Sequence, residues 1–122
     1  MVEEALQNVG LKNVIDLMPN ELSGGMKRRV ALARTLILKP KIIIYDEPTT
    51  GLDPITSKEI ILLMKSVQEK YKTSSIIITH DVDCARVIAN RMILLIDGKN
   101  YAEGTFAELS TSQDPKVKAF FK

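Results

Sequence analysis

Hydrophobic residues follow two patterns along this chain: some recur at helical spacing, and others form short unbroken runs. Between Ser23 and Pro40 the apolar positions fall three or four residues apart, which predicts a helix over residues 24–38. Ser23 is a favourable residue to cap its start, and Pro40 prevents its continuation. The apolar positions of this predicted helix are Met26, Val30, Ala33 and Ile37.

Three unbroken runs predict β-strands, over residues 42–45, 75–79 and 91–96. The first run, Ile42-Ile43-Ile44-Tyr45, has no polar alternation and ends at Asp46, so it predicts a strand that is buried on both faces. Asp97-Gly98 is typical of a hairpin turn and predicts a short antiparallel strand over residues 101–103.

The remaining segments alternate with these strands and predict helices. Asp53 followed by Pro54 is a strong helix start, and the apolar stripe behind it extends to Tyr71. Further helices are predicted over residues 2–9, 81–89, 105–109 and 115–121, with a short helix or turn over 11–20. The alternation of helices and strands favours an α/β layered fold with a parallel core.

The composition is that of one small globular domain. The chain has 122 residues, of which 45% are hydrophobic and 26% are charged, and these are ordinary values for a folded protein. Its apolar runs are far shorter than the roughly 20 residues of a membrane-spanning helix. Met1 is followed by Val2-Glu3-Glu4 rather than by a signal-peptide pattern, so a cytosolic location is the default expectation.

Charge and aromatic content disfavour nucleic-acid binding. The net charge is +2 with both signs mixed, and three tyrosines and three phenylalanines offer no stacking platform. Cys84 is the only cysteine, so the sequence permits no intrachain disulfide. We interpret Cys84 as a small residue of a helix.

Candidate chemistry begins at the start of the helix predicted over residues 24–38. There, Ser23-Gly24-Gly25 would combine free backbone amides with the positive end of the helix dipole, which together form a seat for an anion. The serine adds a hydroxyl group, and the glycines carry no side chain that would keep a phosphate away from the backbone. These three residues are therefore candidates for phosphate contact.

Further candidates follow the predicted strands. Asp46 and Glu47 stand at the carboxyl end of a parallel strand, where open α/β sheets bind ligands. Asp53 closes the segment Gly51-Leu52-Asp53, and it also has a structural explanation as the cap of the next helix. His80 is the only histidine. A lone histidine is usually structural, and this one directly follows a predicted strand.

Together these fragments resemble the rear part of an ABC-type ATPase subunit. The sequence Leu-Ser-Gly-Gly-Met-Lys-Arg-Arg-Val-Ala-Leu-Ala-Arg is similar to the family's signature and its helix, with Arg29 and Arg34 at the usual basic positions. Met26 stands in place of the commoner glutamine. The segment 42–47 resembles the Walker B motif, Gly51-Leu52-Asp53 the D-loop, and His80 the switch histidine.

The resemblance implies a role for each of these residues. Glu47 would polarise the attacking water, and His80 would contact the terminal phosphate. Asp46 would hold Mg²⁺ through water, because that ion prefers oxygen ligands and keeps much of its hydration. The implied ATP-binding residues are Ser23, Gly24, Gly25, Asp46 and Asp53. ATP and Mg²⁺ are therefore the expected cofactors.

The fold implied by the resemblance is a partial P-loop NTPase-like ABC ATPase domain, a parallel sheet with flanking helices and the end of the helical subdomain. Residues 1–39 would form the end of that subdomain and the signature helix, and residues 40–122 would hold the Walker B, D-loop, H-loop and C-terminal parts. None of the six glycines has the spacing of a phosphate-binding loop. The strand that feeds this loop, which the family places between strands 75–79 and 91–96, is missing, so we expect the chain alone to be inactive.

Three short segments resemble the ATPases that power Mla-type phospholipid transport together with Mce-domain proteins. They are residues 112–121, Asp53-Pro54-Ile55-Thr56 and Gly25-Met26. The resemblance implies a homodimeric ATPase subunit that works beneath membrane permease subunits, on the cytoplasmic face of the cell membrane. An Mce-domain substrate-binding protein is a further implied partner, and nucleic acid is not one.

Three alternatives remain open from the sequence. An ABC ATPase for another cargo would differ in its permease. A DNA-repair or chromosome-associated ATPase shares the signature and Walker B pattern, but such proteins usually carry a long coiled coil, and this chain has no sustained heptads. A non-catalytic interaction fragment is supported by the missing phosphate-binding loop.

Overall fold

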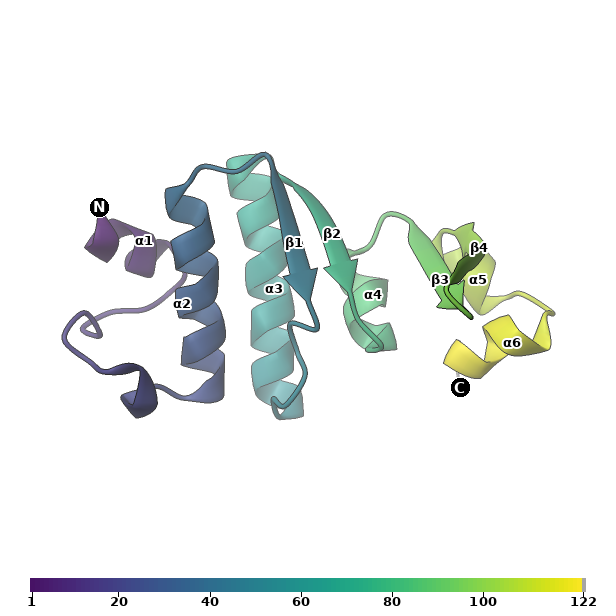
Figure 1. Ribbon diagram of the computed structural model, residues 1–122, viewed down its shortest axis with the longest axis horizontal. Helices are drawn as coiled ribbons and strands as arrows, with labels where there is room; N and C mark the ends of the chain where they lie inside the picture. The colour runs from purple at the N-terminus through teal and green to yellow at the C-terminus, as the bar shows by residue number, and fades with distance from the viewer. Residues whose placement is uncertain (122) are drawn as a thin grey trace. The chain divides into compact units, whose positions relative to one another are not determined.

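The computed structural model describes residues 1–121, which form two compact units divided after Ile78 (Figure 1). Each unit has its own secondary structure and its own buried side chains. The first unit contains, in chain order, α1 (Val2–Asn8), a 3₁₀ turn (Pro19–Glu21), α2 (Gly24–Ile37), β1 (Ile42–Asp46), α3 (Pro54–Tyr71) and β2 (Ser74–Ile78). The second contains α4 (Val82–Ile88), β3 (Met92–Ile96), β4 (Lys99–Gly104), α5 (Phe106–Ser110), α6 (Pro115–Lys118) and a 3₁₀ turn (Ala119–Phe121).

The helices of the first unit begin where the sequence predicts. The Ser23 hydroxyl accepts a hydrogen bond from the Met26 amide at 3.1 Å and so caps α2. Asp53 caps α3 in the same way, through the Thr56 amide at 3.0 Å. Each cap satisfies an amide that has no partner within the helix. Between α1 and α2 the predicted short helix or turn is reduced to turns and the single 3₁₀ turn.

Gly10 ends α1, with a positive φ of 78°. Its amide donates to the Gln7 carbonyl at 2.9 Å, and the Leu11 amide donates to the Leu6 carbonyl at 2.9 Å. This pair of bonds is the Schellman arrangement, which needs a left-handed residue that glycine adopts without strain. The turn sends the chain back so that Leu11 is buried in the core of the first unit.

Strands β1 and β2 pair in parallel, from Ile42 beside Ser74 to Asp46 beside Ile78. The prediction that β1 is buried on both faces is wrong. Ile43 is 4% exposed, whereas Ile42 and Ile44 are 60% and 64% exposed. Side chains alternate along a strand, and the helices of this unit cover only one face of its two-stranded sheet. The other face is a patch of four exposed isoleucines, Ile42, Ile44, Ile76 and Ile78.

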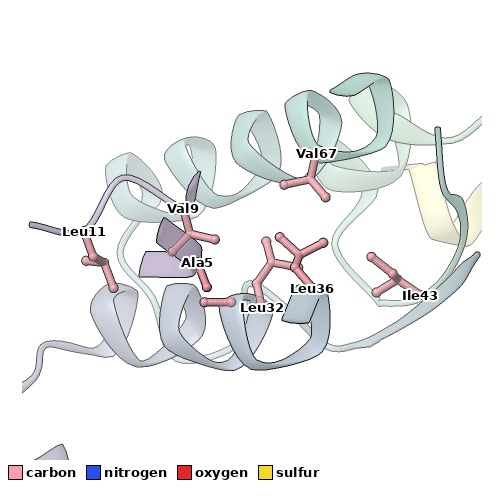
Figure 2. Close-up of a cluster of buried hydrophobic side chains, with 8 residues drawn as sticks. Ala5, Val9, Leu11, Leu32, Leu36, Ile43 and Val67 are labelled. Carbon is pink, nitrogen blue, oxygen red and sulfur yellow. The ribbon is translucent and has the colours of Figure 1, made fainter. Parts of the chain in front are cut away.

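The core of the first unit lies between α1, α2, α3 and the covered face of β1 (Figure 2). Leu32 and Leu36 of α2 are buried together with Ile43 of β1 and Val67 of α3. A polar contact adds to this packing, because the Arg29 guanidinium donates to the Val9 carbonyl at 2.6 Å. This contact fixes the end of α1 against α2.

The second unit is built on the predicted hairpin. β3 and β4 are antiparallel, and the turn residues Asp97 and Gly98 both have positive φ, of 51° and 72°. Leu94 of β3 is buried with Leu109 and Val117 of the following helices. In the part of the chain that the structure describes, β2 pairs with β1 and β3 pairs with β4.

One smaller expectation is also confirmed. Cys84 is a fully buried residue of α4, as its interpretation as a small helix residue predicts. Within residues 1–121, no helix combines the length and apolar character that crossing a bilayer requires.

Candidate functional site

The candidate site in the first unit begins at the amino end of α2. Ser23 and Gly24 are exposed there, whereas Gly25 is buried. A β-carbon on Gly25 would lie 2.7 Å from Cγ2 of Thr56, and one on Gly24 would lie 3.0 Å from Cδ2 of Leu52. The glycines therefore have a second use that sequence reasoning missed, since they allow the start of α2 to lie directly against the start of α3.

Asp46 is the last residue of β1 and lies on its uncovered face. It alternates with Tyr45, whose ring faces the covered side, so Asp46 shares the open face with Ile42 and Ile44. Burial raises the pKa of Tyr45 to about 12, because its charged form would lose hydration. The two neighbours thus have opposite environments, and only the carboxylate is presented to solvent.

Glu47 follows with a backbone conformation that the sequence does not predict. Its φ is +47°, a left-handed value that costs a non-glycine residue about 1 kcal/mol or more. The Glu47 amide donates to the Ile78 carbonyl at 2.8 Å, which extends the pairing of β1 and β2 by one bond. The Thr50 hydroxyl donates to a Glu47 carboxylate oxygen at 3.1 Å. Both the backbone and the side chain of Glu47 are therefore held.

The loop between Glu47 and Asp53 is connected to α2 by a residue that sequence reasoning did not select. The Arg28 guanidinium donates to the Thr50 carbonyl at 2.6 Å. Within the loop, the Thr50 amide donates to the Glu47 carbonyl at 3.3 Å and the Leu52 amide to the Thr49 carbonyl at 3.2 Å. The loop is thus a hydrogen-bonded turn that is fixed at both ends.

Asp53 is fully exposed but closely bonded. Its carboxylate accepts from the Thr56 hydroxyl at 2.6 Å and from the Thr56 amide at 3.0 Å. These bonds, the hydroxyl first, lower the pKa of Asp53 below its usual value. The structural explanation of Asp53 as a helix cap is therefore confirmed.

His80 lies in the second unit, two residues after the end of β2, and is exposed. The next residue, Asp81, caps α4 by accepting from the amides of Asp83 and Cys84 at 3.0 and 3.2 Å. The Asp81 amide donates to the Thr79 hydroxyl at 2.9 Å. These bonds fix the backbone on both sides of His80.

The described part of this chain would supply only a few of the ligands of a magnesium ion. Among residues 1–121, no three His, Cys, Asp or Glu side chains gather as a metal-binding group. Mg²⁺ is often held by one or two carboxylates together with water and substrate phosphates. The exposed carboxylate of Asp46 at the end of β1 suits that mode of binding.

Known proteins are similar to this chain in sequence and in fold. A family model described as ABC transporter matches residues 1–50. The intermembrane phospholipid transport system ATP-binding protein MlaF of Haemophilus influenzae is 46% identical over 117 residues, 96% of this chain and 44% of that protein. The energy-coupling factor transporter ATP-binding protein EcfA of Methanocaldococcus jannaschii is 42% identical over 118 residues, 97% of this chain and 42% of that protein.

A solved structure agrees with these relatives. The dimeric, post-hydrolysis ATP-binding cassette MJ0796 bound to ADP and Pi is similar with a TM-score of 0.71 and 38% identity, over 84% of this chain and 44% of that chain. The chain belongs to the ABC transporter ATP-binding domain family. It spans less than half the length of these relatives. The predicted class, an α/β chain that forms part of an ABC ATPase domain, is confirmed.

The two glycines of this ABC segment give a matched pair of stability predictions. We expect overpacking in Gly25→Ala to lower the free energy of unfolding by roughly 1–3 kcal/mol. Replacing a helical glycine offsets part of this loss, by under about 1 kcal/mol. Thr56 cannot move away easily, because Asp53 holds its hydroxyl. Gly24→Ala meets only the tip of Leu52 and should be close to neutral. Urea denaturation of both variants tests this, and equal stability of the two would contradict the close approach at Gly25.

The bonds of Asp53 predict how this segment responds to acid. Because its pKa is lower in the folded chain than in the unfolded one, Asp53 contributes stability above the unfolded value of about 3.8. That contribution is lost as the pH falls through the folded pKa. We expect Asp53→Asn, which retains a capping oxygen, to flatten the fall in melting temperature below about pH 4. An unchanged acid limb in this variant would show that other carboxylates dominate it.

Proposed function

We propose that this chain is part of the ATP-binding and ATP-hydrolysing subunit of an ABC transporter, and that the transporter moves phospholipid. One arrangement carries the proposal. The Asp46-Glu47 pair at the end of a parallel strand and the Ser23-Gly24-Gly25 helix start belong to one unit, and the Arg28–Thr50 hydrogen bond connects them. Hydrolysis of a nucleotide held between two subunits requires an acidic pair on one side of the nucleotide and an anion-binding helix start on the other. In a dimer with two such sites, each subunit would supply the acidic pair to one site and the helix start to the other.

Each site residue has a proposed role. The Ser23 hydroxyl and the backbone amides of Gly24 and Gly25 would donate to the terminal phosphate of an ATP held by a second subunit. Glu47 would orient the attacking water and accept its proton. Asp46 would hold Mg²⁺ through water, and that ion would neutralise phosphate charge when bound. The remaining proposed contacts to nucleotide are Asp53 and His80.

The same proposal covers organisation and partners. Residues 1–39 would be the end of the helical subdomain and the signature helix, and residues 40–122 the Walker B, D-loop, H-loop and C-terminal parts. The subunit would act as a homodimer on the cytoplasmic face of a membrane, beneath permease subunits. The similarity to MlaF supports phospholipid as the cargo and an Mce-domain protein as a further partner.

The C-terminal segment is held to the preceding strand by the carboxylate of Asp114. Asp114 caps α6 through the Lys116 amide at 2.9 Å and accepts from the Tyr101 hydroxyl at 2.6 Å. The segment 112–121, which resembles that of Mla-type ATPases, is therefore fixed to β4.

The second candidate function is ATP hydrolysis for another cargo, which the similarity to EcfA favours.

A chimera tests the proposal directly. This chain replaces its matching region in MlaF of Haemophilus influenzae, and the chimera is produced with that organism's own transport partners. We expect ATP hydrolysis by the chimera and none by the 122-residue chain alone. Rescue of a strain that lacks MlaF would support phospholipid as the cargo, whereas hydrolysis without rescue would favour another cargo. Hydrolysis by the chain alone would overturn the proposed division of the nucleotide site.

A further inference from the structure

Arg28 is the basic residue of α2 that reaches the loop carrying Glu47. Its guanidinium donates to the Thr50 carbonyl at 2.6 Å across 22 positions of sequence, and the residue is half-buried. Arg29, one of the two arginines that the family resemblance selects, instead donates to the Val9 carbonyl in the other direction. Arg28 and Arg29 therefore attach α2 to two different parts of the first unit.

Thr50 relays this contact to the carboxylate. While its carbonyl accepts from Arg28, its hydroxyl donates to the Glu47 carboxylate at 3.1 Å and its amide donates to the Glu47 carbonyl at 3.3 Å. A guanidinium that donates to a carbonyl forms a charge-assisted bond, which is stronger than a bond between neutral groups. The position of Thr50, and through it that of the Glu47 side chain, is thus coupled to α2.

The left-handed backbone of Glu47 is the reason why this coupling matters. A glutamate with φ of +47° does not rest in its preferred conformation, so the surrounding contacts must hold it there. The Ile78 carbonyl holds its amide, and Thr50 holds its carbonyl and carboxylate. Arg28 fixes Thr50 from α2, whose first residues carry the proposed phosphate seat.

We infer that Arg28 is a positioning residue, which sets the Glu47 carboxylate through Thr50 and ties it to the helix start at Ser23. The expected effect of Arg28 on turnover rests on the proposed ATPase function. Its expected effect on the loop rests only on the contacts of Arg28. A shift of about 1 Å in a reacting group can lower a rate by around a hundredfold. Loss of Arg28 should therefore slow hydrolysis while nucleotide still binds.

Steady-state kinetics of the chimera provide the first test. We expect Arg28→Met to lower kcat about 10- to 100-fold and to leave the KM for ATP within about twofold, since a positioning defect acts on the reaction and not on ground-state binding. Arg28→Lys, which retains a donor, should recover part of the loss. Lys27→Met, at the exposed neighbouring position, is the control and should retain full activity. An unchanged kcat in Arg28→Met, or a raised KM alone, would overturn the inference.

A double-mutant cycle separates this role from a general loss of structure. Residues that act through one another have non-additive effects, so Arg28→Met should lower the residual turnover little further in a Glu47→Gln chimera. Thr50→Val, which keeps the carbonyl but removes the hydroxyl, should likewise be non-additive with Arg28→Met. Additive losses in both cycles would show that Arg28 does not act through Thr50 and Glu47.

Hydrogen exchange of the 122-residue chain tests the same contact without any activity. The amides of Thr50 and Leu52 are bonded within the loop, and they should exchange faster in Arg28→Met than in Lys27→Met. Equal exchange in the two variants would overturn the inference whether or not the chimera hydrolyses ATP. If the chimera is inactive but exchange rises only in Arg28→Met, the proposed function fails and the positioning contact stands.

Discussion

Glu47→Gln is expected to reduce ATP turnover by the chimera about 10² to 10⁴-fold, which is the usual contribution of a positioned general base. Glutamine has the same shape and can still accept from the Thr50 hydroxyl, so the loop should keep its arrangement. It cannot take a proton from water at neutral pH. Turnover should therefore fall while ATP binding persists, and bound ATP should accumulate instead of ADP.

The measurement is single-turnover hydrolysis beside equilibrium nucleotide binding. Glu47→Asp is an informative second variant, because it keeps a base but withdraws it by one methylene, and it should lose less activity than Glu47→Gln. The matched control is Glu59→Gln, an exposed glutamate of α3 that lies outside the proposed site. Full turnover in Glu47→Gln would remove the proposed role of Glu47, and loss of ATP binding would indicate a structural one.

The local signals in the sequence are strong where one residue decides a structure. Ser23 and Asp53 cap α2 and α3 as predicted, because a short polar side chain ahead of an apolar stripe has few other uses. Gly10 and Gly98 end a helix and form a turn for a similar reason, since both need positive φ. The boundaries of α2, α3 and β1 follow from these residues within one or two positions.

Only some features of the candidate site can be predicted from the sequence. The order of Ser23, Asp46, Glu47 and His80 along the chain carries the family resemblance. The contacts of Arg28 and Thr50 do not follow from order, because a bond across 22 positions depends on how α2 lies against the loop. The left-handed φ of Glu47 is equally hidden, since glutamate is not a residue that favours it.

The run Ile42-Ile43-Ile44 shows a different limit. Three identical residues contain no alternation, so the sequence favours a strand with two buried faces. Burial of the second face depends on a layer that must be supplied by other residues, and the first unit supplies helices on one side only. Ile42 and Ile44 are therefore exposed although their sequence is that of a central strand.

Adjacent isoleucines of β1 are expected to differ sharply in their contribution to stability. Ile43→Ala should lower the free energy of unfolding by about 2–5 kcal/mol, since Ile43 is 4% exposed and packs with Leu36 and Val67. Ile44→Ala, at 64% exposure on the opposite face, should change it by under about 0.5 kcal/mol. Urea denaturation of the 122-residue chain measures both, and the substitution is chemically identical, so strand propensity cancels between them. A large loss in Ile44→Ala would mean that the uncovered face is covered in solution, and similar small losses in both would contradict the packing of Ile43 against α2 and α3.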